Sequence, residues 1–412
     1  MKYGLIGGRL GHSFSKEVHA MLADYDYEIR EIPKDELDAF MTTADFNAIN
    51  VTIPYKEAVI PYLSYISDEA RAIGAVNTIV KKDGKLFGYN TDFLGMTAQI
   101  HKMNLNLKGK KTVILGTGGT SKTAYAVAKS LGASPIITVS RTKKHGAVDY
   151  DELYTMHTDA EVIINTTPVG MYPDNFSSPV DISCFARLEG VIDAIYNPIR
   201  TKLVIDAKKR GIIAEGGLYM LVAQAVYASE IFIGVKHTEE KLDSIFREIK
   251  CDKENIVLIG MPTSGKSTVA KIIGDKLSRQ ALDTDTIVEE SKKTTISDIF
   301  LAEGESVFRD CESEAVALVS KKNGTVIATG GGAVLRSENV DMLKQNGVLF
   351  FIDRPFECLI PTADRPLAAD VEAIKKRYAE RYKIYCTSAD TVIDANATAE
   401  AVAEKIMGAF HK

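Results

Sequence analysis

Residues 260–267 read GMPTSGKS and match the G-x-x-x-x-G-K-[ST] pattern of a nucleotide phosphate loop at every fixed position. The apolar run NIVLI lies directly before them, and the helix-forming run TVAKIIGDKL lies directly after them. A phosphate loop needs this order of strand, loop and helix, because backbone N–H groups of the loop and of the helix N-terminus bind the phosphates. The pattern therefore predicts that the second part of the chain folds around a parallel sheet and binds a nucleoside triphosphate.

A second glycine-rich loop, LGTGGTSK at residues 115–122, is typical of dinucleotide-binding folds. Gly116 permits the tight turn, and Gly118 and Gly119 let the backbone approach a pyrophosphate. Ser121 stands where the third glycine usually lies and is still small enough for the helix to pack on the strand. Either one of the two loops is only a structural turn, or the chain holds two nucleotides in two domains.

The strand after the second loop indicates which dinucleotide is bound. It ends in Ser140, Arg141 and Thr142, without an acidic residue. An Asp or Glu at this place binds a ribose 2′-hydroxyl, whereas an Arg accommodates a 2′-phosphate. The sequence therefore predicts NADP(H).

Length and composition limit the remaining possibilities. A chain of 412 residues is expected to contain two to four domains. The net charge of −5 gives no basic footprint for nucleic acid or for an anionic membrane, and no apolar run is long enough to span a bilayer. The five cysteines are scattered without a C-x-x-C pair, which favours reduced thiols in the cytoplasm. We expect a cytoplasmic protein with small-molecule partners, whose oligomeric state the sequence leaves open.

Short apolar runs alternate with helix-length amphipathic segments along nearly the whole chain, which indicates βαβ units and mainly parallel sheets. Residues 77–90 are an exception, because two strand-like runs flank Asp83 and Gly84, a hairpin signal. The clearest change in composition is the charged, helix-forming segment 235–255. We place a domain boundary there, near residue 250.

Seven short motifs in the first 235 residues resemble those of shikimate dehydrogenases and occur in the same order. They are GHSFSKEVH (11–19), NVTIPYKE (50–57), GAVNT (74–78), GYNTDFLG (88–95), INTTPVGM (164–171), YNPIRT (196–201) and GGLYMLVAQA (216–225). The resemblance implies a substrate domain made of residues 1–98 and 218–250, and a Rossmann-like NADP-binding domain at residues 99–217. It also implies reduction of 3-dehydroshikimate to shikimate.

Hydride transfer to a ketone needs a proton donor beside the carbonyl oxygen. The residues that match the catalytic pair of the family are Lys56 and Asp92. Those that match its substrate contacts are Ser13, Ser15, Thr52, Asn77, Tyr196 and Gln224. Those expected to bind the cofactor are Gly116, Thr117, Gly118, Gly119, Thr120, Ser140, Arg141, Thr142 and Gly217. The sequence departs from the family at Lys16, which replaces a proline, and at His145, where a second basic residue is often Arg.

In the second part of the chain, Lys266 is expected to reach the β- and γ-phosphates and Ser267 to bind Mg²⁺. Asp283 and Asp285 follow at positions i and i+2, at the end of a predicted strand. One carboxylate can support Mg²⁺, and the other can orient an acceptor hydroxyl. We expect Asp283 to take the first role and Asp285 the second.

A further series of motifs makes residues 254–412 resemble shikimate kinase. They are ISDIFLAEGESVFRDCE (296–312), ATGGGAVL (328–335), DRPL (364–367) and ERYKIY (380–385). By this match the substrate is bound by Asp285, Arg309, Gly331, Gly332 and Arg381, and ATP by Thr263, Ser264, Gly265, Thr268 and the lid residue Arg365. A guanidinium pairs bidentately with a carboxylate, so Arg309 and Arg381 suit a carboxylic acid substrate.

The lid is short. Family members commonly carry another arginine near its beginning, and residues 361–364 contain none. The resemblances together imply an α/β chain with a shikimate-dehydrogenase-like substrate domain, a Rossmann-like NADP domain and a P-loop kinase domain with a parallel sheet at residues 251–412. The first half would make shikimate, and the second would convert it to shikimate 3-phosphate. Three alternatives stay open: a quinate/shikimate dehydrogenase in the first half, a non-catalytic binding or regulatory half, and a different small-molecule P-loop kinase.

Overall fold

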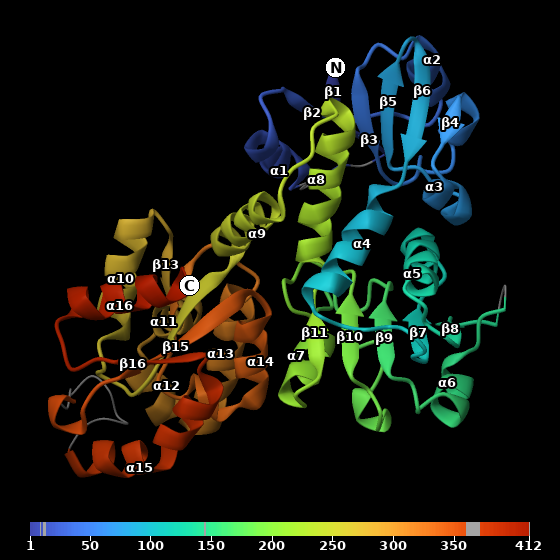
Figure 1. Cartoon of the computed structure of the whole chain (residues 1–412). Helices are drawn as coiled ribbons and strands as arrows, with labels where there is room; N and C mark the ends of the chain where they lie inside the picture. The colour runs from blue at the N-terminus through green and yellow to red at the C-terminus, as the bar shows by residue number, and fades with distance from the viewer. Residues whose placement is uncertain (9, 11–13, 144–145, 360–370, 412) are drawn as a thin grey trace. The chain divides into compact units, whose positions relative to one another are not determined.

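The computed structural model describes residues 1–8, 10, 14–143, 146–359 and 371–411. The chain forms two compact units, Met1–Ile249 and Lys250–Lys412 (Figure 1). Each unit has its own sheets and its own buried core. No helix in the described part of the chain is both long and apolar enough to cross a membrane.

The first sheet of unit 1 has six strands in the order β2-β1-β3-β5-β6-β4. Its strands are β1 (Tyr3–Gly7), β2 (Tyr27–Glu31), β3 (Ala48–Val51), β4 (Tyr65–Ile66), β5 (Thr78–Lys82) and β6 (Lys85–Tyr89). Strands β5 and β6 pair in antiparallel fashion, and Asp83 and Gly84 between them both have positive φ. This confirms the predicted hairpin, since such turns need positive φ at both central residues. The helices around this sheet are α1 (Ser15–Leu22), α2 (Leu37–Thr43), η1 (Ile60–Tyr62) and α3 (Asp68–Ile73).

The second sheet of unit 1 has five parallel strands in the order β11-β10-β9-β7-β8. They are β7 (Thr112–Leu115), β8 (Ile136–Val139), β9 (Val162–Asn165), β10 (Gly190–Asp193) and β11 (Ile213–Glu215). Helix α5 (Gly119–Ser130) packs on one face, and α6 (Tyr150–Met156), η2 (Ile182–Cys184) and α7 (Lys202–Lys209) pack on the other. The strand order reverses beside β7, and ligands of open α/β sheets bind at the carboxyl ends of strands at such a point.

Helices α4 (Thr91–Lys102) and α8 (Leu218–Ile233) connect the two sheets and pack side by side (Figure 1). Their approach is close at Gly95, where an added Cβ would lie 2.7 Å from the backbone oxygen of Met220. A larger residue at position 95 would therefore push the two helices apart. Since the chain enters the second sheet through α4 and leaves it through α8, these helices set how the two sheets face each other.

The charged segment before the boundary forms helix α9 (Glu239–Lys253). Its residues Leu242, Ile245 and Ile249 are buried against α1 and α8 in the core of unit 1. The sequence analysis described this segment as charged and helix-forming, and it did not single out these apolar residues. The apolar residues recur at intervals of three and four, which is the period of a helix with one buried face.

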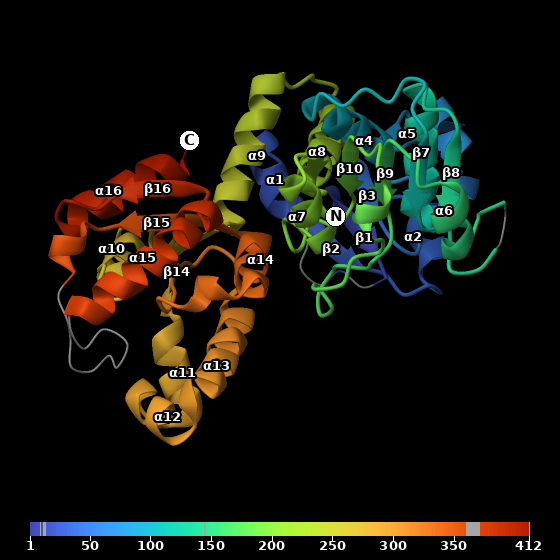
Figure 2. The ribbon, with the colours of Figure 1, turned by 90° about the horizontal axis from the view of Figure 1, so that it is seen from below.

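Unit 2 contains one sheet of five parallel strands in the order β13-β14-β12-β15-β16. Figure 2 labels β14, β15 and β16 of this sheet. The strands are β12 (Asn255–Ile259), β13 (Ala281–Asp283), β14 (Val326–Ala328), β15 (Gly347–Asp353) and β16 (Thr391–Asp394). Helices α10 (Lys266–Leu277) and α16 (Ala399–Phe410) cover one face. The remaining elements are α11 (Thr284–Lys292), α12 (Ile296–Ala302), α13 (Gly304–Val319), η3 (Ala333–Leu335), α14 (Ser337–Asn346), η4 (Phe356–Cys358) and α15 (Val371–Ser388). The parallel sheet that the phosphate loop predicted is thus confirmed, with the loop following its middle strand β12.

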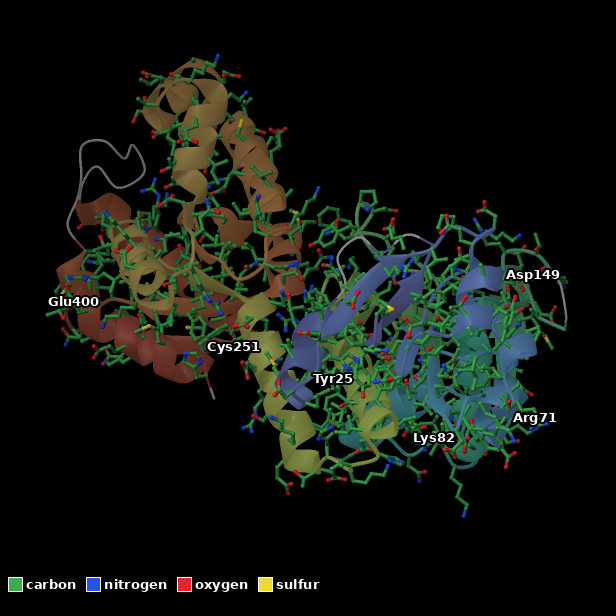
Figure 3. The ribbon with its side chains drawn as sticks, turned by 90° about the horizontal axis from the view of Figure 1, so that it is seen from above. Tyr25, Arg71, Lys82, Asp149, Cys251 and Glu400 are labelled. Carbon is green, nitrogen blue, oxygen red and sulfur yellow. The ribbon has the colours of Figure 1, made fainter. Side chains whose placement is uncertain are left out.

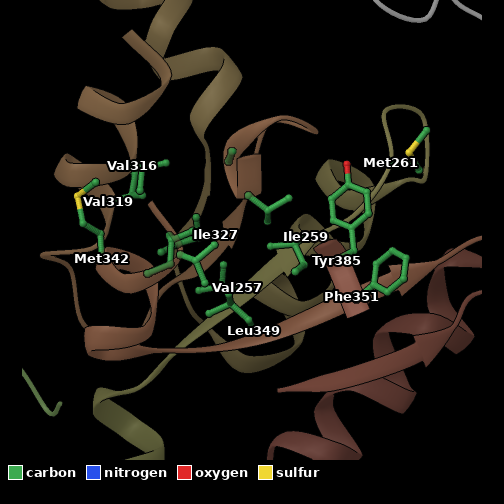
Figure 4. Close-up of a cluster of buried hydrophobic side chains, with 14 of the residues drawn as sticks. Val257, Ile259, Met261, Val316, Val319, Ile327, Met342, Leu349, Phe351 and Tyr385 are labelled. Atoms are coloured by element: carbon green, nitrogen blue, oxygen red, sulfur yellow. The ribbon is translucent and has the colours of Figure 1, made fainter. Parts of the chain in front are cut away.

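The core on the other face of this sheet includes side chains of α13, α14 and α15 (Figure 4). Tyr385 of α15 is fully buried there and stacks on Phe351, with ring centroids 5.1 Å apart. Its hydroxyl donates a hydrogen bond to the backbone oxygen of Gly331. The core therefore holds the glycine-rich segment after β14 in place at the edge of the sheet.

Candidate active sites

Unit 1 contains a cavity of about 440 Å³ that is lined by residues of both of its sheets and of α4 and α8. The described residues that the sequence assigned to catalysis or to substrate binding all line it: Ser15, Thr52, Lys56, Asn77, Asp92, Tyr196 and Gln224. Two residues assigned to the cofactor, Thr120 and Gly217, also line it. The fold therefore joins the expected substrate and cofactor residues in one space.

Lys56 and Asp92 form an ion pair inside this cavity. The Lys56 Nζ lies 2.6 Å from Asp92 Oδ2, and the two side chains are 28% and 19% exposed. Asp92 lies in the first turn of α4, whose N-terminus is capped by the side chain of Asn90. A carboxylate is favoured at a helix N-terminus, so Asp92 can hold the Lys56 ammonium at the cavity wall. The pair has the geometry of a positioned proton donor.

Two further walls of the cavity are shaped by packing. The Tyr196 ring meets Phe14 edge to face at 5.7 Å, and burial raises the pKa of its phenol. At Gly217 an added Cβ would lie 2.3 Å from the backbone oxygen of Ala194. Any side chain at position 217 would therefore displace the start of α8 from the end of β10.

The loop after β7 has the features that a pyrophosphate requires. Gly116 has φ +109°, and an added Cβ there would lie 2.8 Å from Thr166 Oγ1. Around Gly118 and Gly119 there is open space, and no side chain caps the N-terminus of α5. Ser121 donates to the Gly116 oxygen over 2.7 Å, so it closes the turn as well as fitting against the strand. These residues fit a dinucleotide pyrophosphate at the helix N-terminus; Thr117 lies in the same loop.

Arg141 follows β8 and is exposed. No hydrogen bond or ion pair joins it to another residue in the described part of the chain, whereas its neighbour Lys143 is paired with Asp149 and Glu152. Among the described residues of this segment, Arg141 is thus the cation that fits a 2′-phosphate. Beside it, Ser140 is held by a backbone hydrogen bond to Val148, and Thr142 is exposed.

The phosphate loop of unit 2 is folded around Lys266. This lysine is 5% exposed, and its Nζ donates to the backbone oxygens of Gly260 and Met261 over 3.0 and 2.7 Å. Thr263 and Gly265 both have positive φ, and the buried Thr263 Oγ1 has no hydrogen-bond partner among the described residues. An orphaned hydroxyl beside a buried lysine fits a loop that binds phosphate oxygens. Ser264 is buried in this loop, and Thr268 is exposed in the first turn of α10.

Ser267 and Asp283 meet at the start of α10. The Ser267 Oγ donates to Asp283 Oδ2 over 2.5 Å, and Asp283 Oδ1 accepts from the backbone N–H of Asp285 over 2.9 Å. A hydroxyl and a carboxylate at the surface of a phosphate loop are hard oxygen ligands, which suit Mg²⁺. The residues therefore fit the metal role that the sequence assigned to them.

The backbone of Asp285 is bonded to this pair, but its carboxylate lies near that of Glu312 of α13. An added Cβ at Gly330 would lie 2.5 Å from both Asp285 Oδ1 and Glu312 Oε1. Burial raises the pKa of Glu312, the neighbouring Arg309 lowers it, and Asp285 raises it further. The carboxylates of Asp283 and Asp285 thus have different neighbours, as different roles would require.

Arg309 is 8% exposed, and both arms of its guanidinium are already paired. Its Nη1 lies 2.7 Å from Glu312 Oε2, and its Nη2 lies 2.9 Å from Glu305 Oε1. Burial opposes the charge of Arg309, but the two glutamates outweigh it and raise the pKa of the guanidinium. The Glu312 side chain is 1% exposed and that of Glu305 54%, so Glu305 is the partner that a substrate carboxylate can replace.

Arg381 of α15 reaches the same glycine-rich segment. It is 6% exposed, and its Nη1 donates to the backbone oxygen of Gly331 over 3.2 Å. At Gly332 an added Cβ would lie 1.8 Å from Arg309 Nη1, and at Gly331 one would lie 2.7 Å from Pro262 Cδ of the phosphate loop. The glycines therefore let two arginines and the phosphate loop approach one another.

Ser13, Arg365 and the lid residues 361–364 lie outside the described residues. The sequence analysis did not single out Asn50, Glu305, Glu312, Arg354 and Arg377. Asn50 lines the cavity of unit 1 and stands two residues before Thr52 in the strand-like run NVTIP, a spacing that places two side chains on one face. Arg354 directly follows β15, and its Nη1 would lie 3.8 Å from a Cβ added to Gly265. Burial, together with the charge of Arg381, lowers the pKa of Arg377.

Comparison with known proteins assigns each unit to a family. A model of the shikimate dehydrogenase substrate binding domain matches residues 5–79, and a model of shikimate kinase matches residues 262–410. The NADP(+) shikimate dehydrogenase of Clostridium perfringens strain SM101 is 37% identical over 267 residues, which cover 60% of this chain and 98% of that protein.

Solved structures agree with this assignment for unit 1. A chorismate mutase/shikimate 5-dehydrogenase fusion protein from Clostridium acetobutylicum is 37% identical, with a TM-score of 0.57, and the match covers 60% of this chain and 96% of that one. The shikimate 5-dehydrogenase of Thermus thermophilus, solved in complex with NADP(H) and shikimate, is 27% identical, with a TM-score of 0.54 over 60% of this chain and 99% of that one.

Proposed function

Because this chain belongs to the shikimate dehydrogenase family and carries a shikimate kinase domain in its second unit, it is a bifunctional enzyme of the shikimate pathway, and we propose that it catalyses two successive steps. Unit 1 reduces 3-dehydroshikimate to shikimate with NADPH. Unit 2 transfers the γ-phosphoryl group of ATP to shikimate and forms shikimate 3-phosphate. The observation that carries this proposal is the cavity of unit 1, where the Lys56–Asp92 pair meets the expected substrate and cofactor residues.

In unit 1, bound NADPH supplies the hydride that reaches the carbonyl carbon. Lys56 gives the proton to the carbonyl oxygen as that oxygen becomes a hydroxyl, and Asp92 keeps the ammonium aimed into the cavity. Shikimate oxidation needs the reverse transfer, with Lys56 as the base. We assign Ser15, Thr52, Asn77, Tyr196 and Gln224 to substrate binding, because they line the same space.

In unit 2, ATP supplies the phosphoryl group when it is bound with Mg²⁺. Asp285 orients the substrate hydroxyl and accepts its proton, while Lys266 leaves the loop carbonyls to neutralise charge on the phosphates. Arg309 and Arg381 bind the carboxylate of shikimate from two sides. Ser267 and Asp283 hold Mg²⁺.

We add Arg354 to the nucleotide site of unit 2. Its Nε donates to the backbone oxygen of Cys358 over 3.3 Å, which holds the guanidinium beside the phosphate loop at Gly265. A cation at this place complements phosphate charge. It offers a counter-charge that does not depend on the lid.

We place the enzyme in the cytoplasm, with small molecules as its substrates. All five cysteines are unpaired in the structure, as is usual in a reducing compartment.

The direct test supplies 3-dehydroshikimate, NADPH and Mg-ATP to the purified chain and follows shikimate 3-phosphate by mass spectrometry. We expect one NADPH oxidised and one ADP formed for each shikimate 3-phosphate. Accumulation of shikimate without phosphate transfer would contradict the kinase assignment. Absence of NADPH oxidation with 3-dehydroshikimate, in a preparation that phosphorylates added shikimate, would contradict the dehydrogenase assignment.

A further inference from the structure

A chain of buried hydrogen bonds runs behind one wall of the cavity in unit 1. It joins β2, β3, β5 and the first residue of α4, and its members are Tyr27, Asn50, Asn77, Thr78 and Thr91. Each of these residues is at most 6% exposed. Asn50 and Asn77 line the cavity, whereas the two threonines lie behind it. The resemblance to shikimate dehydrogenases assigned a role only to Asn77.

Backbone partners fix the orientation of both amides. The backbone N–H of Thr91 donates to Asn77 Oδ1 over 2.7 Å, and Asn50 Nδ2 donates to the backbone oxygen of Asn77 over 3.3 Å. A backbone N–H can only donate and a backbone oxygen can only accept, so neither amide can exchange its oxygen and nitrogen without placing like groups together. The polarity of this wall therefore follows from the fold.

The two amides consequently offer different groups to a ligand. No described residue accepts a hydrogen bond from Asn77 Nδ2, so its N–H groups remain for the cavity. Asn50 donates from its Nδ2 to Asn77 and Thr78, its Oδ1 accepts from the Tyr27 hydroxyl over 2.7 Å, and the His19 side chain is a further hydrogen-bonding neighbour. Asn77 thus presents donors, which fit a carbonyl or a hydroxyl oxygen, whereas Asn50 lines the cavity with an amide that its protein partners hold in place.

The Tyr27 end of the chain is held by stacked rings. The His19 ring lies on Tyr27, with centroids 3.9 Å apart and planes 10° apart, and His19 Nδ1 is 2.6 Å from the hydroxyl of Tyr25, which is labelled in Figure 3. Burial lowers the pKa of His19 to about 3, so the ring stays neutral and brings no charge to the chain. Tyr27 can therefore keep its hydroxyl on Asn50.

Thr78 joins the two amides. Its Oγ1 accepts from Asn50 Nδ2 over 3.0 Å and donates to Asn77 Oδ1 over 3.0 Å. We propose that Thr78 is a positioning residue of the dehydrogenase, which orients Asn50 and Asn77 so that they read the hydroxyl pattern of the substrate. This role rests on the proposed reduction of 3-dehydroshikimate in unit 1 and adds to it a residue that never touches the substrate.

The test compares Thr78→Val with Thr78→Ser in the full chain. Valine leaves Asn50 Nδ2 without its hydroxyl acceptor and Asn77 Oδ1 without one of its donors, so Asn50 Nδ2 keeps only its 3.3 Å bond to the backbone oxygen of Asn77 and both amides are held less firmly. We expect the dehydrogenase KM for shikimate to rise about tenfold, while the KM for NADP and kcat change less than threefold. Thr78→Ser keeps the hydroxyl and should restore the KM to within about twofold of the original value.

Thr112→Val is the matched control, because Thr112 is also fully buried in a strand of unit 1 and bonds only a backbone oxygen, that of Lys110. It should leave the KM for shikimate unchanged. The far-UV circular dichroism and thermal unfolding of each variant report that unit 1 is folded, and ATP-dependent phosphorylation reports the same for unit 2. If Thr78→Val does not fold, Thr78→Ala takes its place with the same expected rise in KM.

An unchanged KM for shikimate in a folded Thr78 variant would overturn the proposal. Equal changes in the KM values of both dehydrogenase substrates, or the same change in Thr112→Val, would do so as well, because they would show a general structural role. Absence of dehydrogenase turnover in the unaltered chain is a distinct result, which would contradict the proposed function itself.

Discussion

The two substrate sites of this chain hold their polar groups by different means. In unit 1, neutral hydrogen bonds of Asn50, Asn77 and Thr78 fix the cavity wall, beside the ion pair of Lys56 and Asp92. In unit 2, the groups expected to bind substrate are charged and already paired, as with Arg309 between Glu305 and Glu312.

This difference determines what each site must do before substrate binds. The polar groups of unit 1 are already in place, whereas those of unit 2 must exchange protein partners for substrate. A substrate can enter the cavity of unit 1 without displacing a protein group from Asn77 Nδ2. In unit 2 a carboxylate has to replace Glu305 at Arg309, and phosphates have to replace the loop carbonyls at Lys266. Binding in unit 2 would therefore replace existing protein contacts at both cations, whereas binding in unit 1 would leave the fixed amides in place.

The largest effect is expected when the proton donor of unit 1 is removed. Lys56→Ala should lower kcat for NADP-linked shikimate oxidation by about 10²- to 10⁴-fold, the usual contribution of general acid–base catalysis. ATP-dependent phosphorylation should stay within about twofold, because unit 2 carries its own site. Lys102→Ala removes a surface ion pair of the same 2.6 Å length, with Asp243, and should leave both activities intact. Near-normal oxidation by Lys56→Ala would refute its assigned role.

The next largest effect is expected when an arginine is removed from the substrate site of unit 2. Arg381→Ala should raise the kinase KM for shikimate about a hundredfold, because the substrate carboxylate loses a charge-assisted bond to a nearly buried guanidinium. The KM for ATP should change less than threefold. Lys383→Ala, on the exposed side of the same helix, removes equal charge and should change neither KM. A loss confined to ATP affinity would reverse the role that we assign to Arg381.

A smaller effect concerns cofactor choice in unit 1. Arg141→Ala should weaken NADP binding about tenfold and NAD binding less than twofold, because an exposed cation that faces a 2′-phosphate is partly screened by solvent. Titration of both cofactors by fluorescence measures the difference. Lys143→Ala is the control, since that lysine is already paired with Asp149 and Glu152. Equal losses for NADP and NAD would place Arg141 away from the 2′-phosphate.

The smallest effect sharpens the contrast between the sites. Glu305→Gln should lower the kinase KM for shikimate about twofold, because half-exposed ion pairs contribute roughly 0.2–1 kcal/mol and Arg309 would be released from one of them. Glu314→Gln removes an exposed charge from the same helix and should leave the KM unchanged. A higher KM in Glu305→Gln would mean that Glu305 orients Arg309 for the substrate and does not compete with it.

The sequence predicted those features of the molecule that depend on residues close together in the chain. The phosphate loop at 260–267, the glycine-rich turn after β7 and the hairpin at Asp83 each need particular residues at neighbouring positions, so their order along the chain reveals them. The residues that line the cavity of unit 1 come from distant segments. Their spacing in the sequence does not predict that they lie together, and they were identified by the resemblance to a known family.

What the sequence did not predict depends on contacts between distant segments. Glu305 and Glu312 lie three or four positions from Arg309 on α13, but only the fold shows that this helix face is buried. Nothing in the sequence distinguishes Thr78 and Thr91 from other threonines, because only the folded hairpin and the start of α4 bring them to Asn77. Because α9 is rich in charged residues, the sequence analysis did not recognise its buried apolar face, which consists of Leu242, Ile245 and Ile249.

The central claim is that each unit carries a complete and independent active site, and complementation between two disabled chains tests it most directly. Lys56→Ala and Lys266→Ala each remove one site, so neither chain alone should convert 3-dehydroshikimate, NADPH and Mg-ATP to shikimate 3-phosphate. An equimolar mixture should form shikimate 3-phosphate at the rate of two independent enzymes at these concentrations, after a lag in which shikimate accumulates. Product from either chain alone, or none from a mixture in which each chain keeps its remaining activity, would contradict the claim.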